Sequence, residues 1–165
     1  MDEVMFWRLV EASKAECTPE LSNQPELLQH ELEQLSPEEI RGFDSIFRQL
    51  YLRAYRRDLW AAAFIIEGGC SDDGFMDFRG GLIGLGREAY YAALANPESL
   101  AEQPARGVDF SQEDMLYVAA RAYEAVTGGE LPDSGQADPD LVGEDWDERT
   151  VYELYPKLTH IFRDS

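Results

Sequence analysis

Polar side chains that could do chemistry gather in one short stretch, residues 70–79, which reads CSDDGFMDFR. Asp73 and Asp77 are four residues apart, so a helix would place both carboxylates on one face, where Asp72 or Glu67 could join them. Oxygen ligands of this kind suit Mg²⁺, and two carboxylates could equally act as the acid and the base of a hydrolase. One hypothesis is therefore a small-molecule or divalent-metal-dependent enzyme centred on Cys70–Arg79, with Asp72, Asp73 and Asp77 as candidate catalytic residues.

Other catalytic arrangements in this stretch are incomplete. A thiol nucleophile at Cys70 would need a base, yet the two histidines, His30 and His160, are remote in sequence, and the adjacent aspartates oppose a thiolate. The chain carries neither the elbow motif of a serine hydrolase nor a glycine-rich phosphate loop. The sequence therefore contains no complete catalytic set that we can identify.

Ordinary helix-end physics offers the same residues a structural role. Ser71 can cap a helix, and Asp72 and Asp73 would lie in its first turn, where carboxylates interact well with exposed amides. Cys70 suits a small buried apolar position. In this interpretation the corner belongs to a binding surface rather than an active site. Its candidate binding residues are Arg57, Asp58, Trp60, Cys70, Ser71, Arg79 and Arg87.

Basic residues are concentrated just before the corner. Five of the 14 are arginines in one short region: Arg41, Arg48, Arg53, Arg56 and Arg57. One explanation is internal neutralisation, in which Asp58 and Asp77 pair with Arg57 or Arg79. The alternative is an anion-binding site, since guanidinium groups pair well with carboxylates and phosphates.

The overall charge is strongly acidic. Thirty-three acidic residues against 14 basic ones give a net charge of −19, which repels nucleic-acid phosphates and anionic membranes. We therefore expect no direct nucleic-acid binding and no membrane binding. The charge is typical of a solubilising surface, and its sharper interpretation is recognition of a basic protein partner or mimicry of a nucleic acid's charge.

Several features predict a cytoplasmic protein without a cofactor. The two cysteines form no CxxC pair, the first residues lack the basic start of a signal peptide, and the longest apolar run, Leu59–Ile66, is too short to span a bilayer. Glu26, His30 and Glu33 share a helix face and could hold a divalent ion. Surface helices rich in glutamate often show that spacing, so we expect no metal there.

Apolar residues at helical spacing predict an all-α fold: one compact domain over residues 1–165, built from about six to seven helices. Asp2, Ser36, Ser71 and Ser111 are expected caps, and Gly68 and Gly128 are expected stops. Residues 129–148 hold eight acidic and no basic residues, which predicts a solvated loop or arm, and residues 149–162 should dock back on the core. The expected helices begin near residues 2, 25, 37, 58, 71, 87 and 111.

Three glycines interrupt the helix that should follow Ser71. Glycine in a helix costs about 1 kcal/mol relative to alanine, so Gly80, Gly81 and Gly84 together require an offset of about 3 kcal/mol. Close approach of a neighbouring helix or of a ligand would supply it, and a helix is the commoner explanation.

The run from Asp58, DLWAAAFIIEGGCSDDGFMDFRGGLIGLGREAYYAALANPESLA, resembles the core signature of a bacterial family called domain of unknown function 4240. The opening MDEVMFWRLVEA, the segment MLYVAARAYEAVTG, and Trp146, Tyr155-Pro156 and Leu158 also resemble that family. The resemblance covers most of the chain and implies no established activity.

Taken together, these patterns predict a non-catalytic binding or regulatory module that acts through protein contacts in a bacterial cytoplasm. One version is an inhibitor or immunity-type protein that binds a basic toxin or nucleic-acid enzyme. The enzyme centred on Cys70–Arg79 is the alternative.

Overall fold

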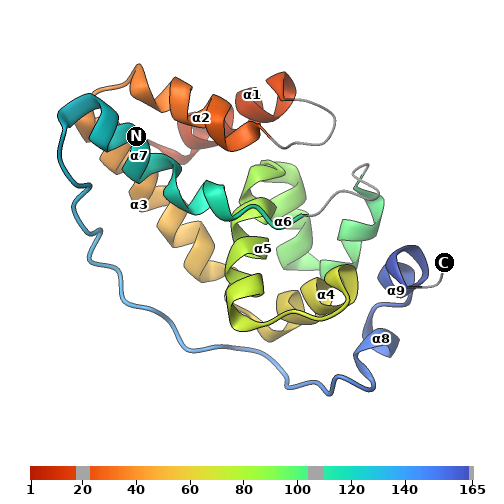
Figure 1. Cartoon of the computed structure of the whole chain (residues 1–165). Coiled ribbons are helices and arrows are strands. Elements are labelled where there is room, and N and C mark those ends of the chain that lie inside the picture. Colours follow the sequence, from red (N-terminus) through yellow and green to blue (C-terminus); the bar gives the residue numbers. More distant parts are fainter. Residues whose placement is uncertain (18–22, 104–109, 164–165) are drawn as a thin grey trace.

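The computed structural model describes residues 1–17, 23–103 and 110–163. Within these residues it contains helices and no strand, and the all-α prediction is confirmed (Figure 1). The elements are α1 (Glu3–Glu16), α2 (Gln24–Glu33), α3 (Pro37–Arg53), α4 (Arg57–Glu67), α5 (Asp72–Gly84), α6 (Arg87–Ala95), η1 (Pro97–Glu102), η2 (Glu113–Tyr117), α7 (Val118–Thr127), α8 (Val151–Leu154) and α9 (Pro156–Phe162), where η1 and η2 are 3-10 helices.

Local signals set most helix boundaries. Ser36 forms the expected capping box, because its hydroxyl accepts the Glu39 amide at 3.2 Å while the Glu39 carboxylate accepts the Ser36 amide at 3.4 Å. Asp2 caps α1 through the Met5 amide at 2.8 Å. Gly68 ends α4 with a φ of 70°, a left-handed conformation that glycine adopts without a steric penalty.

The predicted cap at Ser111 is wrong. The chain stays extended through Gln112, and a 3-10 helix precedes α7 without a side-chain cap. Two contacts hold this stretch in place: the Ser111 hydroxyl donates to the Glu67 carboxylate, and the Gln112 amide donates to the Asp77 carbonyl at 3.0 Å. Pairing with α5 therefore replaces the capping box that the sequence pattern favours.

The glycines of α5 are explained by this pairing. A Cβ on Gly81 would lie 1.4 Å from the Phe110 carbonyl oxygen, and one on Gly80 would lie 3.1 Å from the Gln112 carbonyl oxygen. A Cβ on Gly84 would lie 3.1 Å from the Gln24 side chain. Neighbouring protein segments, including extended backbone as well as helices, thus occupy the space that these glycines leave.

The core surrounds α5, which Figure 1 shows in the middle of the helical body. Helix α7 packs against α2 and α3, and η2 packs against α5. The largest fully buried side chains come from α1 to α6 and form one cluster. They are Phe6, Leu28, Leu32, Ile40, Phe43, Leu59, Ile65, Phe75, Phe78, Leu82, Ile83 and Tyr90.

Residues 129–148, called the strap below, run from α7 along the outside of α3 and α4 to α8 (Figure 1). Gln136 anchors the strap by donating its amide to the Ser45 carbonyl at 3.1 Å. Beyond it, α8 and α9 pack on α4 and bury Val151 and Leu158 completely. Residues 129–148 thus lie outside the helices, and the two helices that follow contact α4.

Replacing Gly81 with alanine tests the close approach of α5 and Phe110. Overpacking a filled site commonly costs about 1–3 kcal/mol, which outweighs the gain in helix propensity of about 1 kcal/mol. Because the obstructing atom is backbone, we expect Gly81→Ala to reduce the free energy of unfolding in urea by about 2 kcal/mol or more. Gly129→Ala, whose Cβ would meet only Thr127 at 3.8 Å, is the control and should be near neutral. Equal stability of the two variants would contradict the packing.

Candidate functional site

The polar residues at the start of α5 form a tight structural corner. The Ser71 hydroxyl accepts the Gly74 amide at 3.1 Å, as expected for a cap. The Trp60 indole donates to the Cys70 carbonyl at 2.9 Å and stacks on Phe75 with ring centroids 4.8 Å apart. The contacts of Trp60 tie the first turn of α4 to the start of α5 and the residue before its cap.

The three candidate catalytic aspartates do not assemble into a metal site. Asp72 and Asp73 are exposed in the first turn of α5, where their negative charges interact favourably with the helix dipole. Asp77 is half-buried. Among the described residues no group of three or more His, Cys, Asp or Glu side chains is arranged to hold a metal ion. On α2, the exposed His30 and the half-buried Glu33 form a pair with nitrogen and oxygen 3.6 Å apart.

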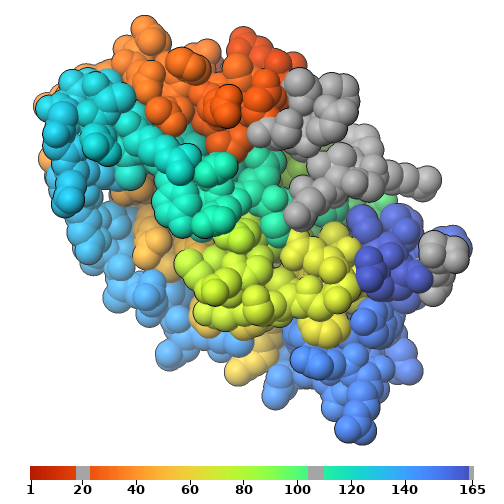
Figure 2. All heavy atoms as spheres, in the orientation of Figure 1, coloured from red at the N-terminus to blue at the C-terminus, as the bar shows by residue number. Residues whose placement is uncertain are grey.

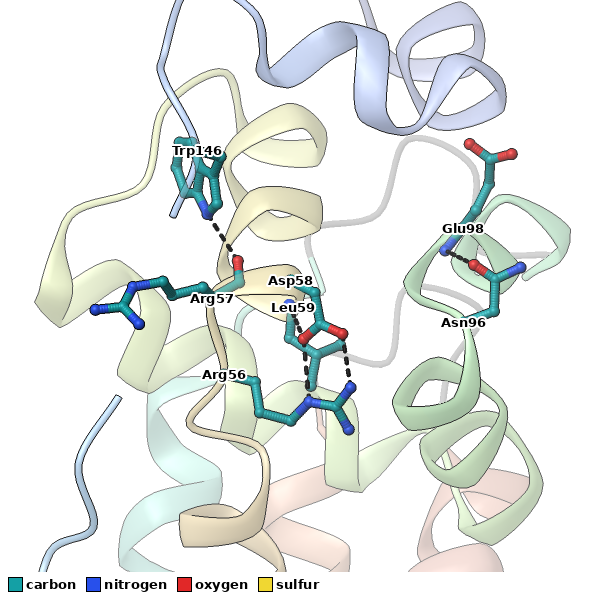
Figure 3. A network of polar contacts seen from close by, with 7 residues as sticks. All are labelled: Arg56, Arg57, Asp58, Leu59, Asn96, Glu98 and Trp146. Atoms are coloured by element: carbon teal, nitrogen blue, oxygen red, sulfur yellow. Dashed lines mark hydrogen bonds and ion pairs between the residues drawn. The ribbon is translucent and has the colours of Figure 1, made fainter. Parts of the chain in front are cut away.

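Asp58 pairs with Arg56, and the expected pairing with Arg57 is wrong. The Arg56 guanidinium donates to both Asp58 carboxylate oxygens, at 3.1 Å and 2.6 Å, and the Leu59 amide donates to one of them at 2.8 Å (Figure 3). The Asp58 carboxylate is thus bound by Arg56, and the Arg57 guanidinium donates to carbonyls of the strap instead. The geometry is that of a bidentate pair, which fixes the first turn of α4.

Arg57 instead holds the strap. Its amide donates to the Val142 carbonyl at 2.8 Å, and its guanidinium donates to the carbonyls of Gly143 at 2.8 Å and Leu141 at 3.2 Å. Its own carbonyl accepts the Trp146 indole at 2.7 Å (Figure 3). The remaining arginines of this region are spread apart, with Arg53 near the Tyr91 hydroxyl at 3.4 Å.

Arg79 is the one charged residue that is buried among residues 1–17, 23–103 and 110–163, with only 4% of it exposed. Its guanidinium lies over the rings of Tyr51, Tyr55 and Phe75, at 4.0, 4.7 and 4.8 Å from their centroids. It donates to the Tyr51 carbonyl and hydroxyl, each at 3.2 Å, and to the Phe75 carbonyl at 3.4 Å. Burial lowers the pKa of the Arg79 guanidinium, and the neighbouring Tyr51 and Tyr55 side chains oppose that shift.

A pocket of about 260 Å³ opens beside this guanidinium. It lies between α3, α5 and the strap, and at its rim Arg48 and Asp138 form an ion pair with nitrogen and oxygen 3.6 Å apart. We call it the Arg79 pocket. Its lining residues are Arg48, Tyr51, Leu52, Tyr55, Asp72, Met76, Arg79, Asp138 and Pro139.

The candidate binding residues thus fall into separate places. Arg79 and Asp72 line the pocket, and Arg57 contacts the strap. Arg87 lies at the start of α6, where its amide donates to Glu11 at 3.2 Å. Sequence reasoning missed Tyr51 and Tyr55. Tyr51 lies on α3 and Tyr55 lies just beyond its C-cap, Ala54, so a helical spacing of four does not account for their meeting at Arg79.

The fold and these contacts define a small all-α domain with a charged pocket and a C-terminal strap. None of its described helices combines the length and the apolar character needed to cross a membrane.

The chain belongs to DUF4240, a family described as protein of unknown function, whose model matches residues 1–125. Neither a search of curated proteins nor a search of solved structures found a match. The matched region includes α3 and α5 and ends before the strap, so it does not extend to the C-terminal residues that carry part of the resemblance.

Replacing Ser71 with alanine tests whether its role is structural. Loss of the cap should reduce the free energy of unfolding by about 1 kcal/mol. Ser71→Asp keeps an acceptor for the Gly74 amide and should retain nearly the original stability. Urea unfolding of the two variants gives the comparison, and an unchanged midpoint for Ser71→Ala would assign Ser71 another role.

Proposed function

We propose that this domain is a non-catalytic binding or regulatory module of a bacterial cytoplasm, and that it uses the strap to recognise a basic protein partner. One observation supports the proposal most directly: the hydrogen bonds that hold the strap on the helices are made mainly by groups other than its acidic side chains. Its eight acidic residues are all exposed. They are Glu130, Asp133, Asp138, Asp140, Glu144, Asp145, Asp147 and Glu148.

The anchors of the strap are main-chain atoms and two neutral side chains. Val142, Leu141 and Gly143 contribute carbonyl oxygens, while Gln136 and Trp146 contribute side-chain donors. Ordering a flexible segment costs about 1–2 kcal/mol per residue in backbone entropy, and a partner that meets an ordered strap avoids that cost.

Local roles leave the acidic groups available. Asp133, Asp145 and Asp147 each accept one nearby backbone amide, at 2.9, 3.0 and 2.7 Å, and a carboxylate has further acceptor sites. The Arg48–Asp138 pair is solvent-exposed, and such pairs contribute about 0–1 kcal/mol. Acidic side chains on a fixed segment would steer a basic surface toward it and align it.

The distribution of charge also supports a protein partner over a nucleic acid. A net charge of −19 opposes approach to phosphate backbones and anionic membranes. A toxin or nucleic-acid enzyme with a basic surface would instead be attracted, so an inhibitor or immunity-type role is the version that we favour.

The enzyme hypothesis has less support from the arrangement of the side chains. It requires two carboxylates of the corner to converge on one point in a concave pocket. Asp72 lines the Arg79 pocket, whereas Asp73 and Asp77 are not among the pocket's lining residues. A binding module is therefore the function that the geometry favours.

A pull-down with matched charge variants tests the proposal. The bait is the full chain, applied to lysate of the source cell at moderate salt, and we expect it to retain a basic protein. The strap variant Asp140→Asn, Glu144→Gln, Glu148→Gln should lose that protein. The control variant Glu16→Gln, Glu31→Gln, Glu88→Gln changes the net charge equally on α1, α2 and α6 and should retain it.

Two outcomes would contradict the proposal. If the full chain retains no basic protein, the partner class is wrong. If both triple variants retain the protein equally, recognition lies outside the strap.

A further inference from the structure

We propose that the Arg79 pocket binds a small organic monocarboxylate, whose anionic group pairs with the Arg79 guanidinium and whose apolar part lies against the pocket wall. The proposal does not depend on partner binding, although the strap contributes Asp138 and Pro139 to the rim of the pocket.

The first argument is charge. Arg79 is 96% removed from solvent, since only 4% of it is exposed, and in the part of the chain that the structure describes no carboxylate lies within the 4.0 Å of an ion pair with it. A buried cation without a counter-ion is unfavourable, and aromatic faces compensate only in part. Asp72, which also lines the pocket, stabilises the charged guanidinium only from beyond ion-pair distance, so the pocket has room for a negative charge in direct contact with Arg79.

The second argument is the number of free donors. A guanidinium carries five N–H groups. Nε, Nη1 and Nη2 of Arg79 each make one hydrogen bond, to Phe75 or Tyr51, within the described residues. One N–H therefore remains on each of Nη1 and Nη2. Two donors on neighbouring nitrogens match the two oxygens of a carboxylate.

The third argument is the composition of the wall. Tyr51, Leu52, Tyr55 and Met76 line the pocket with rings and aliphatic groups, and its volume is about 260 Å³. A space of this size and lining suits a small molecule with an apolar body. An inorganic ion would leave most of the apolar wall without a contact.

The charged residues at the rim of the pocket determine which net charge on the ligand is favoured. Asp72 and Asp138 contribute carboxylates there, and both would repel a second negative charge on the ligand. Arg48 is the second cation of the pocket, and it already forms an ion pair with the Asp138 carboxylate, with nitrogen and oxygen 3.6 Å apart. A monoanion is thus favoured over a phosphate dianion, and the ligand competes with Asp138 for Arg48.

Titration calorimetry of the full chain with sodium benzoate tests the pocket. Benzoate supplies one carboxylate on an apolar ring, and benzamide is its neutral counterpart of nearly the same shape. We expect saturable benzoate binding with a dissociation constant on the order of 1 mM, as for a fragment-sized ligand. Benzamide should bind at least about tenfold more weakly, because the charge-assisted pair is lost. Inorganic phosphate should bind more weakly than benzoate.

Variants locate the binding. Asp138→Asn frees Arg48 and should tighten benzoate binding about twofold to fivefold, the range for an exposed ion pair. Asp140→Asn is the matched control, since it removes the same charge from the strap outside the pocket, and it should leave the affinity unchanged. Arg79→Lys keeps the charge but not the paired donors, and should weaken binding at least about tenfold.

The proposal fails if benzoate does not bind saturably, or if benzamide binds as well as benzoate. It also fails if phosphate binds more tightly than benzoate, or if Asp138→Asn and Asp140→Asn have equal effects. Because these comparisons use the unaltered chain or exposed positions, they remain decisive even if Arg79→Lys does not fold.

Discussion

One residue in the first turn of α4 makes most of the hydrogen bonds that attach the strap. The amide and guanidinium of Arg57 donate to the carbonyls of Val142 and Gly143, and its carbonyl accepts the Trp146 indole, which Figure 3 shows. Because the partners are carbonyls and an indole, the chain is fixed while its carboxylates stay in solvent. The proposed partner surface follows from this division between attachment and charge.

The same attachment completes the Arg79 pocket. The strap passes over α3, where Gln136 and Asp138 contact Ser45 and Arg48, and in this way brings Asp138 and Pro139 to the pocket rim. Figure 2 shows the strap following the outer edge of the helical body. The two proposed sites are therefore neighbours on the structure, although each has its own chemistry.

Local sequence signals were sufficient to predict much of the fold. The caps at Ser36 and Ser71 and the stop at Gly68 each depend on a few consecutive residues, so the pattern alone reveals them. A terminal element that docks on the core was expected for a similar reason, because its apolar residues recur at helical spacing after a long acidic segment.

Contacts between distant segments could not be predicted in the same way. The sequence does not indicate that Phe110 lies against Gly81. The capping pattern at Ser111 was misleading because Ser111 bonds to Glu67 and the Gln112 amide bonds to the Asp77 carbonyl. For Arg79 we expected an aspartate partner, whereas the rings of Tyr51, on α3, and Tyr55, just after that helix, lie beside its guanidinium. Such contacts follow from the way the helices pack. That packing depends on all the core residues together, so no short stretch of sequence reveals it.

Zero-length carbodiimide crosslinking of the captured complex tests the central claim most directly, because it joins aspartate and glutamate side chains to lysines of a bound protein. If the strap is the recognition surface, mass spectrometry will find the crosslinked acidic residues concentrated in residues 129–148. Crosslinks spread over the acidic residues of α1, α2 and α6, with none in the strap, would contradict the account.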